Sequence, residues 1–176
     1  MKTFRFVKIR IALLNLSLLI CTMAYAQRPI DGLILGMSEP ELLSEFTSAH
    51  RNIKPIHGPH GLRGLWSLKS TLMSDLPFES TFFLKDKHVQ RIEQRWASAD
   101  MPCRSQAFFD VLVTNMTTKY GAGLLSSDKV DSQVMRLSAV WEAGEFDVFV
   151  HQSNAVGSCT ILVVYANHVT RDASEL

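Results

Sequence analysis

Apolar residues recur with helical spacing in two stretches of the chain and alternate with polar residues in six others. The stronger helical pattern runs from Pro102 to Tyr120. Its apolar positions recur every three or four residues: Phe108, Phe109, Leu112, Val113, Met116 and Tyr120. Proline is tolerated in the first turn of a helix, and Gly121 follows at the point where helices commonly end on a left-handed residue. The spacing therefore predicts a helix over 102–120 that buries one aromatic-rich face.

A shorter helix is predicted to begin at Ser38. The sequence Ser38-Glu39-Pro40-Glu41 is a capping box, in which the serine and the glutamate three residues later satisfy each other's backbone N–H groups. The apolar face that follows ends at Phe46, so the helix is expected to end near Ser48. The stretch His50–Gly61 contains two prolines and two glycines and is interpreted as a loop.

Alternation of apolar and polar residues, typical of a sheet with one side in solvent, predicts six strands. They are Leu62–Lys69, Ser80–Lys85, Val89–Trp96, Val134–Glu142, Phe146–Gln152 and Ser158–Ala166. Asp86-Lys87 and Ala143-Gly144-Glu145 are short enough to be hairpin turns, whereas Gly123–Gln133 is interpreted as irregular. The last strand is the most apolar of the six and is expected at the centre of the sheet.

The order of these elements predicts an α+β fold, with two helices packed on one face of a mostly antiparallel sheet of about six strands. Trp66 and Trp141 fall at similar points of the two halves, after Gly64-Leu65 and Ala139-Val140. The similarity suggests a duplicated α-β-β-β unit. Its half-repeats are expected at 31–100 and 101–170, inside a single domain over 27–176.

Residues 1–26 have the three parts of a secretory signal peptide. A basic beginning leads into the apolar run Ile11–Ile20, and Ala24-Tyr25-Ala26 is the small-x-small pattern of a cleavage site. The apolar run is about half as long as the roughly 20 residues that a membrane-spanning helix needs. Lipidation of Cys21 is the other alternative, but a bulky residue precedes that cysteine. We therefore expect cleavage after Ala26 and a periplasmic or secreted protein with no transmembrane segment.

The composition is that of one folded domain with a basic leader. Of the 176 residues, 47% are hydrophobic and 20% are charged. Four of the 18 basic residues lie in the first ten positions; without them, 14 basic residues face 17 acidic ones, for a net charge of −3. Binding to a phosphate backbone requires a basic face, so nucleic acid is not an expected partner.

Removal of the leader leaves two cysteines, Cys103 and Cys159. An even number of cysteines in a small exported domain favours a disulfide. A bond that closes the loop between Cys103 and Cys159 would stabilise the fold by about 4 kcal/mol in the chain-entropy model. The competing hypothesis is a catalytic cysteine with His151 or His168 as its base. That chemistry requires an activated thiolate, and the local sequence contains no signature of one.

The sequence contains no phosphate-binding loop, zinc-protease helix, nucleophile elbow or Cys-x-x-Cys pair. We therefore predict a protein that is not an enzyme, has no catalytic residues and binds no cofactor. A hydrolase that uses His151 or a carboxylate is kept as an alternative. Glu142, Glu145 and Asp147 are carboxylates that an acid–base mechanism would need, but they flank a predicted turn and are interpreted as its solvent-facing rim.

A metal-binding loop is the third alternative. His57 and His60 stand three residues apart with His50 upstream, a spacing that allows two imidazoles to share an ion. A structural metal site normally has about four ligands, and no carboxylate lies between Glu45 and Asp75. The segment is therefore interpreted as a solvated loop that contains histidines.

The segment Gly36-Met37-Ser38-Glu39-Pro40-Glu41-Leu42 resembles the start of small envelope proteins of the SmpA/OmlA (BamE-like) type. The predicted pair of helix-plus-sheet units is also similar to β-lactamase inhibitory proteins. Both resemblances imply an exported, non-enzymatic protein that presents a sheet or loop surface to a protein partner in the cell envelope. They assign no binding residue to this chain.

Overall fold

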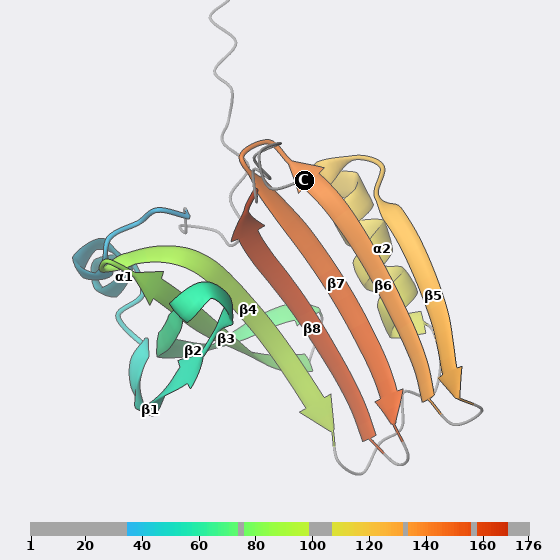
Figure 1. Ribbon diagram of the computed structural model, residues 1–176, viewed down its shortest axis with the longest axis horizontal. Helices are drawn as coiled ribbons and strands as arrows, with labels where there is room; N and C mark the ends of the chain where they lie inside the picture. Colours follow the sequence, from blue (N-terminus) through green and yellow to red (C-terminus); the bar gives the residue numbers. More distant parts are fainter. Residues whose placement is uncertain (1–34, 74–75, 99–106, 132–133, 156–157, 169–176) are drawn as a thin grey trace, which may run out of the picture.

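The chain forms one sheet of eight strands in which every neighbouring pair is antiparallel (Figure 1). The computed structural model describes residues 35–73, 76–98, 107–131, 134–155 and 158–168. The strands are β1 (His50–His57), β2 (Arg63–Met73), β3 (Leu76–Lys85), β4 (His88–Ser98), β5 (Leu124–Asp131), β6 (Val134–Ala143), β7 (Phe146–Ala155) and β8 (Ser158–Asn167). Their order across the sheet is β1-β2-β3-β4-β8-β7-β6-β5. The helical elements are α1 (Glu39–Glu45), α2 (Ala107–Tyr120) and the short 3-10 turn η1 (Pro59–Gly61).

The predicted α+β fold with about six strands is wrong, because the protein is mostly β and its sheet has eight strands. The two strands that were expected to be irregular, β1 and β5, are the two edges of the sheet. An edge strand pairs on one side only and buries little, so it needs no regular apolar alternation. In β1, Pro55 lies within a break in the pairing between Arg51 and Ile56, which is where a strand tolerates proline.

Two hairpin turns fall where the sequence predicts them. Asp86 and Lys87 link β3 to β4, and both have positive φ angles, 50° and 63°, as a type I′ turn requires. Between β6 and β7 the turn consists of Gly144 and Glu145, with φ of 71° at the glycine. The predicted central position of β8 is also confirmed, since it lies between β4 and β7.

The helix α1 begins with the predicted capping box. The carboxylate of Glu41 accepts hydrogen bonds from the backbone N–H of Ser38 at 2.9 Å and from its hydroxyl at 2.6 Å. The helix ends at Glu45, earlier than predicted, because Phe46 has a non-helical backbone with φ −112° and ψ 74°. The ring of Phe46 then stacks on Phe82 of β3, with centroids 5.8 Å apart.

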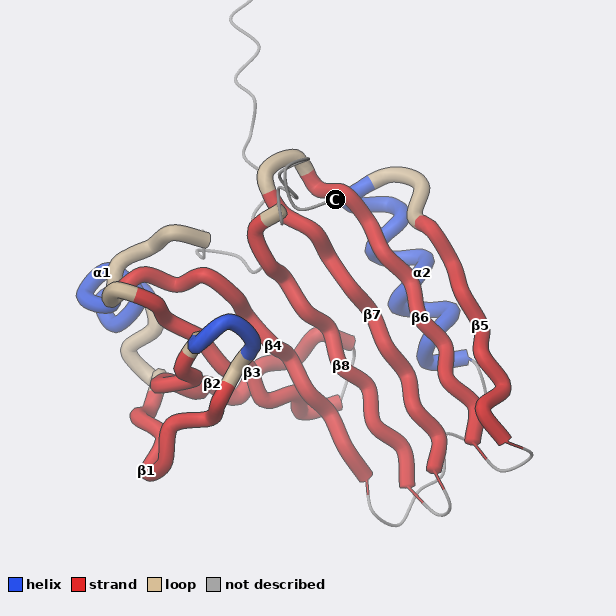
Figure 2. The backbone as a smooth tube through the Cα atoms, viewed as in Figure 1, coloured by secondary structure: helices blue, strands red, loops and turns tan. Residues whose placement is uncertain are grey.

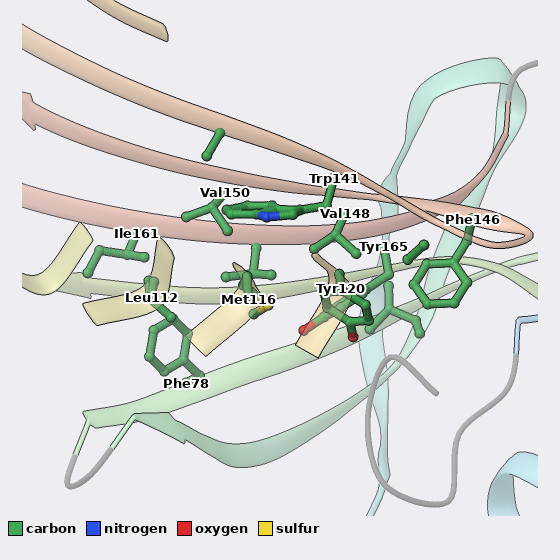
Figure 3. Close-up of a cluster of buried hydrophobic side chains, with 14 of the residues drawn as sticks. Phe78, Leu112, Met116, Tyr120, Trp141, Phe146, Val148, Val150, Ile161 and Tyr165 are labelled. Atoms are coloured by element: carbon green, nitrogen blue, oxygen red, sulfur yellow. The ribbon is translucent and has the colours of Figure 1, made fainter. Parts of the chain in front are cut away.

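The helix α2 has the buried face that its spacing predicts, formed by Phe109, Leu112, Met116 and Tyr120. Its predicted start at Pro102 lies outside the described residues. Gly121 ends the helix with φ of 88°, and its N–H donates to the carbonyl of Thr117 at 2.9 Å. Figure 3 shows Leu112 and Met116 between Phe78 of β3 and side chains of β7 and β8. The helix therefore packs against both halves of the sheet.

One face of the sheet carries the hydrophobic core. Trp141, Val148 and Tyr165 face one another across β6, β7 and β8, and Ile92 and Phe82 continue this row across β4 and β3. All five are buried in one cluster that also contains residues of α1 and α2. The side chains of these strands that point to the opposite face of the sheet are therefore not part of this core cluster.

The topology of the two halves is symmetric. In the described residues, each half consists of one α-helix followed by four strands, with η1 between β1 and β2 in the first half, and the last strands of the halves, β4 and β8, pair at the centre. The repeating unit has four strands instead of the three in the predicted α-β-β-β unit. Trp66 and Trp141 lie on corresponding strands, β2 and β6. A duplication with half-repeats at 31–100 and 101–170 stays a prediction.

Candidate functional site

The side chains of β4–β8 that point away from α2 form a surface that we call the open face. In Figure 1 the helix α2 lies behind β6 and β7, and Figure 2 shows no helix over the near side of β5–β8. The middle of the open face is apolar. Its apolar residues are Leu124 on β5, Val140 on β6, Phe149 on β7, and Leu162 and Val164 on β8.

These residues form a patch because of the strand register. Leu124, Val140, Phe149 and Val164 are directly opposite one another across four strands, and Leu162 stands two residues from Val164 on β8. Leu124 is 80% exposed, while Val140, Phe149 and Leu162 are partly exposed. A contiguous apolar patch with a polar border is typical of a protein-binding surface.

Charged residues lie at both ends of the apolar patch. Glu142 and Asp147 pair across β6 and β7 at the end near their hairpin turn, whereas Arg136 lies at the opposite end of β6. On β4, the guanidinium of Arg91 contacts the carboxylate of Glu93 at 2.7 Å, and both side chains are partly exposed. The strand register also places Arg91 in the row of Glu142 and Asp147, and Asp128 of β5 opposite Arg136, so each end of the open face has charges of both signs.

A serine and a histidine lie opposite each other at the end of the patch nearer Arg136. Ser138 of β6 is directly opposite His151 of β7, and Ser138 Oγ lies 2.9 Å from His151 Nδ1. Partial burial, and secondarily the positive charge of Arg91, lower the pKa of His151 below its ordinary value. A neutral imidazole that accepts a hydroxyl proton is the pairing that general-base catalysis uses. Among the described residues, no carboxylate is hydrogen-bonded to this ring to orient it.

A second histidine, His168, contacts the β6–β7 hairpin at the opposite end of the patch. His168 Nδ1 lies 2.8 Å from a carboxylate oxygen of Asp147, and its Nε2 lies 2.6 Å from the carbonyl oxygen of Gly144. The carbonyl of Gly144 raises the pKa of His168, and the charges of Asp147 and Glu142 act in the same direction. The histidine thus binds the chain just after β8 to the β6–β7 turn.

The structure separates Cys159 from the two histidines of the competing catalytic-cysteine hypothesis. Cys159 is buried on the core face, at the start of β8, while His151 is on the open face. His168 is engaged at the far end of β8 by Asp147. Cys103 lies outside the described residues, so its disulfide with Cys159 stays a prediction.

The candidate metal ligands lie on a different part of the surface. His57 is the last residue of β1, and His60 is in η1 with a left-handed φ of 53°. Both side chains are exposed, as is His50 at the start of β1. Within the described ranges, no group of three or more histidine, cysteine or acidic side chains is arranged to hold a metal ion.

The open face was missed in the sequence analysis, although a signal for part of it was present. A two-residue turn at Gly144-Glu145 determines the register of β6 and β7, and this register places Ser138 opposite His151. No sequence signal indicated that the patch extends to Leu124, because the segment that forms β5 was predicted to be irregular.

No protein-family model, no curated protein and no solved structure matches this chain. In the part of the chain that the structure describes, no helix is long and apolar enough to cross a membrane.

Proposed function

We propose that this protein is an exported, non-enzymatic binding module that docks a protein partner of the cell envelope on its open face. Export rests on the signal-peptide pattern of residues 1–26 and cleavage after Ala26, which would place the domain in the periplasm or outside the cell. The proposal agrees with what the resemblance to BamE-like and β-lactamase inhibitory proteins implies.

The apolar patch of the open face carries this proposal. On the core face of β6–β8 the apolar residues are buried in the core cluster, whereas Leu124, Val140 and Phe149 on the open face keep apolar surface in contact with solvent. Phe149 is the largest of these side chains and is at the centre of the patch. Aromatic residues at the centre of an interface commonly supply most of its binding energy.

The test is capture of partners from a periplasmic extract by three forms of the mature protein. Phe149→Asp places a charge at the centre of the open face, and Val111→Asp places the same charge on α2, where Val111 is 46% exposed. We expect a stoichiometric partner to bind the wild type and the Val111 variant and to be lost with the Phe149 variant. Both variants must retain the wild-type circular dichroism spectrum. A partner that binds all three forms equally would contradict docking on the open face.

A hydrolase is the second candidate, because Ser138 and His151 are within hydrogen-bond distance on an accessible surface. In this case Ser138 would be the nucleophile and His151 its base. Ser138→Ala and His151→Ala should each abolish a hydrolytic activity found against ester, peptide or glycan substrates. Activity that survives both substitutions would show that Ser138 and His151 are not its nucleophile and base.

A further inference from the structure

We propose that a bend in the edge strand β1 docks on the surface of an anionic lipid bilayer. The bend consists of residues 52–55 and is a second interaction surface, distinct from the open face. The inference goes beyond the proposed function and does not depend on the partner of the open face. It is carried by a fully exposed isoleucine in the bend and by the basic residues around it.

Side-chain hydrogen bonds hold the β1 bend in place. The pairing of β1 with β2 is interrupted between Arg51 and Ile56, and Figures 1 and 2 show that β1 bends sharply at the outer edge of the sheet. The side-chain amide of Asn52 donates to the carbonyl of Gly64 at 3.0 Å, and its oxygen accepts the hydroxyl of Ser67 at 2.9 Å. The bend is therefore a built part of the fold.

The β1 bend presents apolar surface to solvent. Ile53 is 100% exposed, and Ile56 just after the bend is 46% exposed. Protection of the sheet edge accounts for the break in pairing and for Lys54 and Pro55, because bulges, lysines and prolines hinder pairing with another strand. It does not account for an isoleucine that buries almost no surface in the fold. Exposed apolar surface with a polar border is typical of a contact with a protein or a membrane.

The border of this apolar surface is basic. Arg51 and Lys54 are close to Ile53 in β1, and Arg63 of β2 is opposite the last residue of β1; all three cations are exposed. Positions 46–74 contain no acidic residue. Among the described residues, none of the three cations has a carboxylate within ion-pair distance. Their charges are therefore available to an anionic surface.

The acidic residues of the first half belong to other elements. Those in the described ranges are Glu39, Glu41 and Glu45 of α1, Glu79 of β3, Asp86 of the β3–β4 turn and Glu93 of β4. In Figure 1, α1 lies apart from the β1 bend, and the β3–β4 turn is joined to α1 by a backbone hydrogen bond. Glu79 and Glu93 are each matched by an arginine of β4. Because charges beyond about 10 Å are screened in salt solution, the bend can attract anions although the mature chain has a net charge of −3.

A bilayer fits the β1 bend better than a protein does. A protein partner would need a recess for Ile53 and carboxylates at matching positions, whereas a bilayer accepts a protruding apolar side chain and presents phosphates in any register. The centre of a protein interface commonly contains tryptophan or tyrosine, and positions 50–57 contain neither. Basic residues and buried apolar surface each strengthen binding to anionic lipids. With one isoleucine and three cations, we expect the contact to be weak and reversible.

Vesicle flotation tests this contact. The mature protein is mixed with vesicles of phosphatidylcholine alone, or of phosphatidylcholine with phosphatidylserine, which supply a neutral and an anionic surface. We expect the wild type to float with the anionic vesicles only and to be released as the salt concentration rises. A wild type that does not bind anionic vesicles at low salt, or that binds both kinds equally, would overturn the inference.

Two matched pairs of variants locate the contact. Ile53→Asp should weaken binding to the anionic vesicles about tenfold or more, whereas Val111→Asp makes the same charge change on α2 and should bind as the wild type does. Lys54→Glu should also weaken binding about tenfold, and Lys85→Glu, at an exposed position of β3 beside the β3–β4 turn, should not. All four variants must retain the wild-type circular dichroism spectrum. Equal effects within either pair would contradict docking through the bend.

Tryptophan fluorescence tests whether the bend enters the lipid interface. With anionic vesicles, the emission of the Ile53→Trp variant should shift to shorter wavelength relative to the wild type, because an indole ring is stabilised at a membrane interface. The Val111→Trp variant should show no such shift. An Ile53→Trp variant that binds the vesicles without a shift would show that the apolar tip does not enter the interface and would overturn the inference.

A protein partner at the β1 bend would give a different pattern. If the wild type ignored anionic vesicles, and Lys54→Glu instead reduced the capture of a protein from a periplasmic extract, the bend would bind a protein and not a bilayer. The outcome is separable from that of the proposed function. A protein that captures a partner through Phe149 but ignores vesicles overturns only the membrane contact, and vesicle binding without such a partner contradicts only the proposed function.

Discussion

At the scale of single residues, the turn between β3 and β4 adopts a conformation that its sequence does not favour. Lys87 has φ of 63° without being a glycine, and the left-handed region costs an ordinary residue about 1–2 kcal/mol. Its carbonyl nevertheless accepts the N–H of Glu39 at 2.8 Å and thereby joins the turn to α1. The contact uses only the backbone of Lys87, so any residue that tolerates this conformation can make it.

Lys87→Gly should therefore stabilise the protein. Removal of the left-handed strain outweighs the extra chain entropy of glycine, and we expect a net gain of about 0.5–1 kcal/mol in the free energy of unfolding. Denaturant titration measures the change. Lys85→Gly is the matched control, because Lys85 is exposed in β3 and has no positive φ; it should lose stability instead. A loss in both variants would contradict the strain at Lys87.

His168 should make stability depend on pH. Both of its ring nitrogens face acceptors, the carboxylate of Asp147 and the carbonyl of Gly144, so only the protonated ring donates to both. These contacts raise its pKa above the unfolded value of 6.5. The stabilisation is fully present below pH 6.5 and is lost as pH rises through the raised, folded pKa.

The measurement compares the wild type with His168→Gln by denaturant titration at several pH values. Because the ring is partly exposed, solvent screens its interactions and the difference should be small. We expect the wild type to be the more stable protein in mildly acidic solution and the difference to shrink above neutral pH. A difference that grows with pH would show that the histidine is not held as a cation.

At the scale of secondary-structure elements, the sequence predicted the helices and strands that bury a continuous apolar face. The apolar spacing of α2 and the apolar run in β8 both reflect contact with the core, and both were recognised. The edge strands β1 and β5 carry exposed residues such as Ile53 and Leu125 and have little buried surface to impose a pattern. Their strand structure depends on hydrogen bonds to β2 and β6, which no local sequence pattern records.

The candidate site was less predictable than the fold for a related reason. Phe149 and Val140 belong to different strands, and the patch that they form exists only once the register between those strands is known. The histidines His57 and His60, by contrast, were noticed because they are close in sequence. Residues that are close in sequence therefore indicated a candidate site in a loop, whereas the larger apolar patch is formed by residues that are brought together only by pairing between strands.

The buried face of α2 should carry much of the stability of the fold. Leu112 is 1% exposed and packs between the helix and the strands, so Leu112→Ala should cost about 3 kcal/mol in the free energy of unfolding. Val111→Ala, one position away on the exposed side, should change stability by no more than about 0.5 kcal/mol. Equal effects of the two substitutions in denaturant titrations would contradict the packing of α2.

At the scale of the whole molecule, the two halves are joined through their last strands. Arg91 of β4 is opposite Ala166 of β8, and this pairing continues to Ser98 opposite Cys159. The joint connects residues that are far apart in sequence, so the entropy of bringing them together must be offset before the central strands can pair. A covalent link near this joint would reduce that cost in the unfolded chain.

The predicted disulfide between Cys103 and Cys159 would be such a link. Cys159 is on the core face of β8 opposite Ser98, the last residue of β4. Cys103 follows Ser98 by five residues, which can span up to about 17 Å of extended chain. The Cα separation of roughly 5.5–6 Å that a disulfide needs is therefore within reach of this segment.

Replacing both cysteines by alanine should lower the free energy of unfolding by about 2–4 kcal/mol and leave the circular dichroism spectrum unchanged. Thiol titration of the denatured, unreduced protein should find no reactive cysteine in the mature chain, and a reductant should destabilise the wild type but not the double variant. Two reactive thiols in protein recovered from the periplasm would contradict the bond, and the joint between β4 and β8 would then be held by strand pairing and core packing alone.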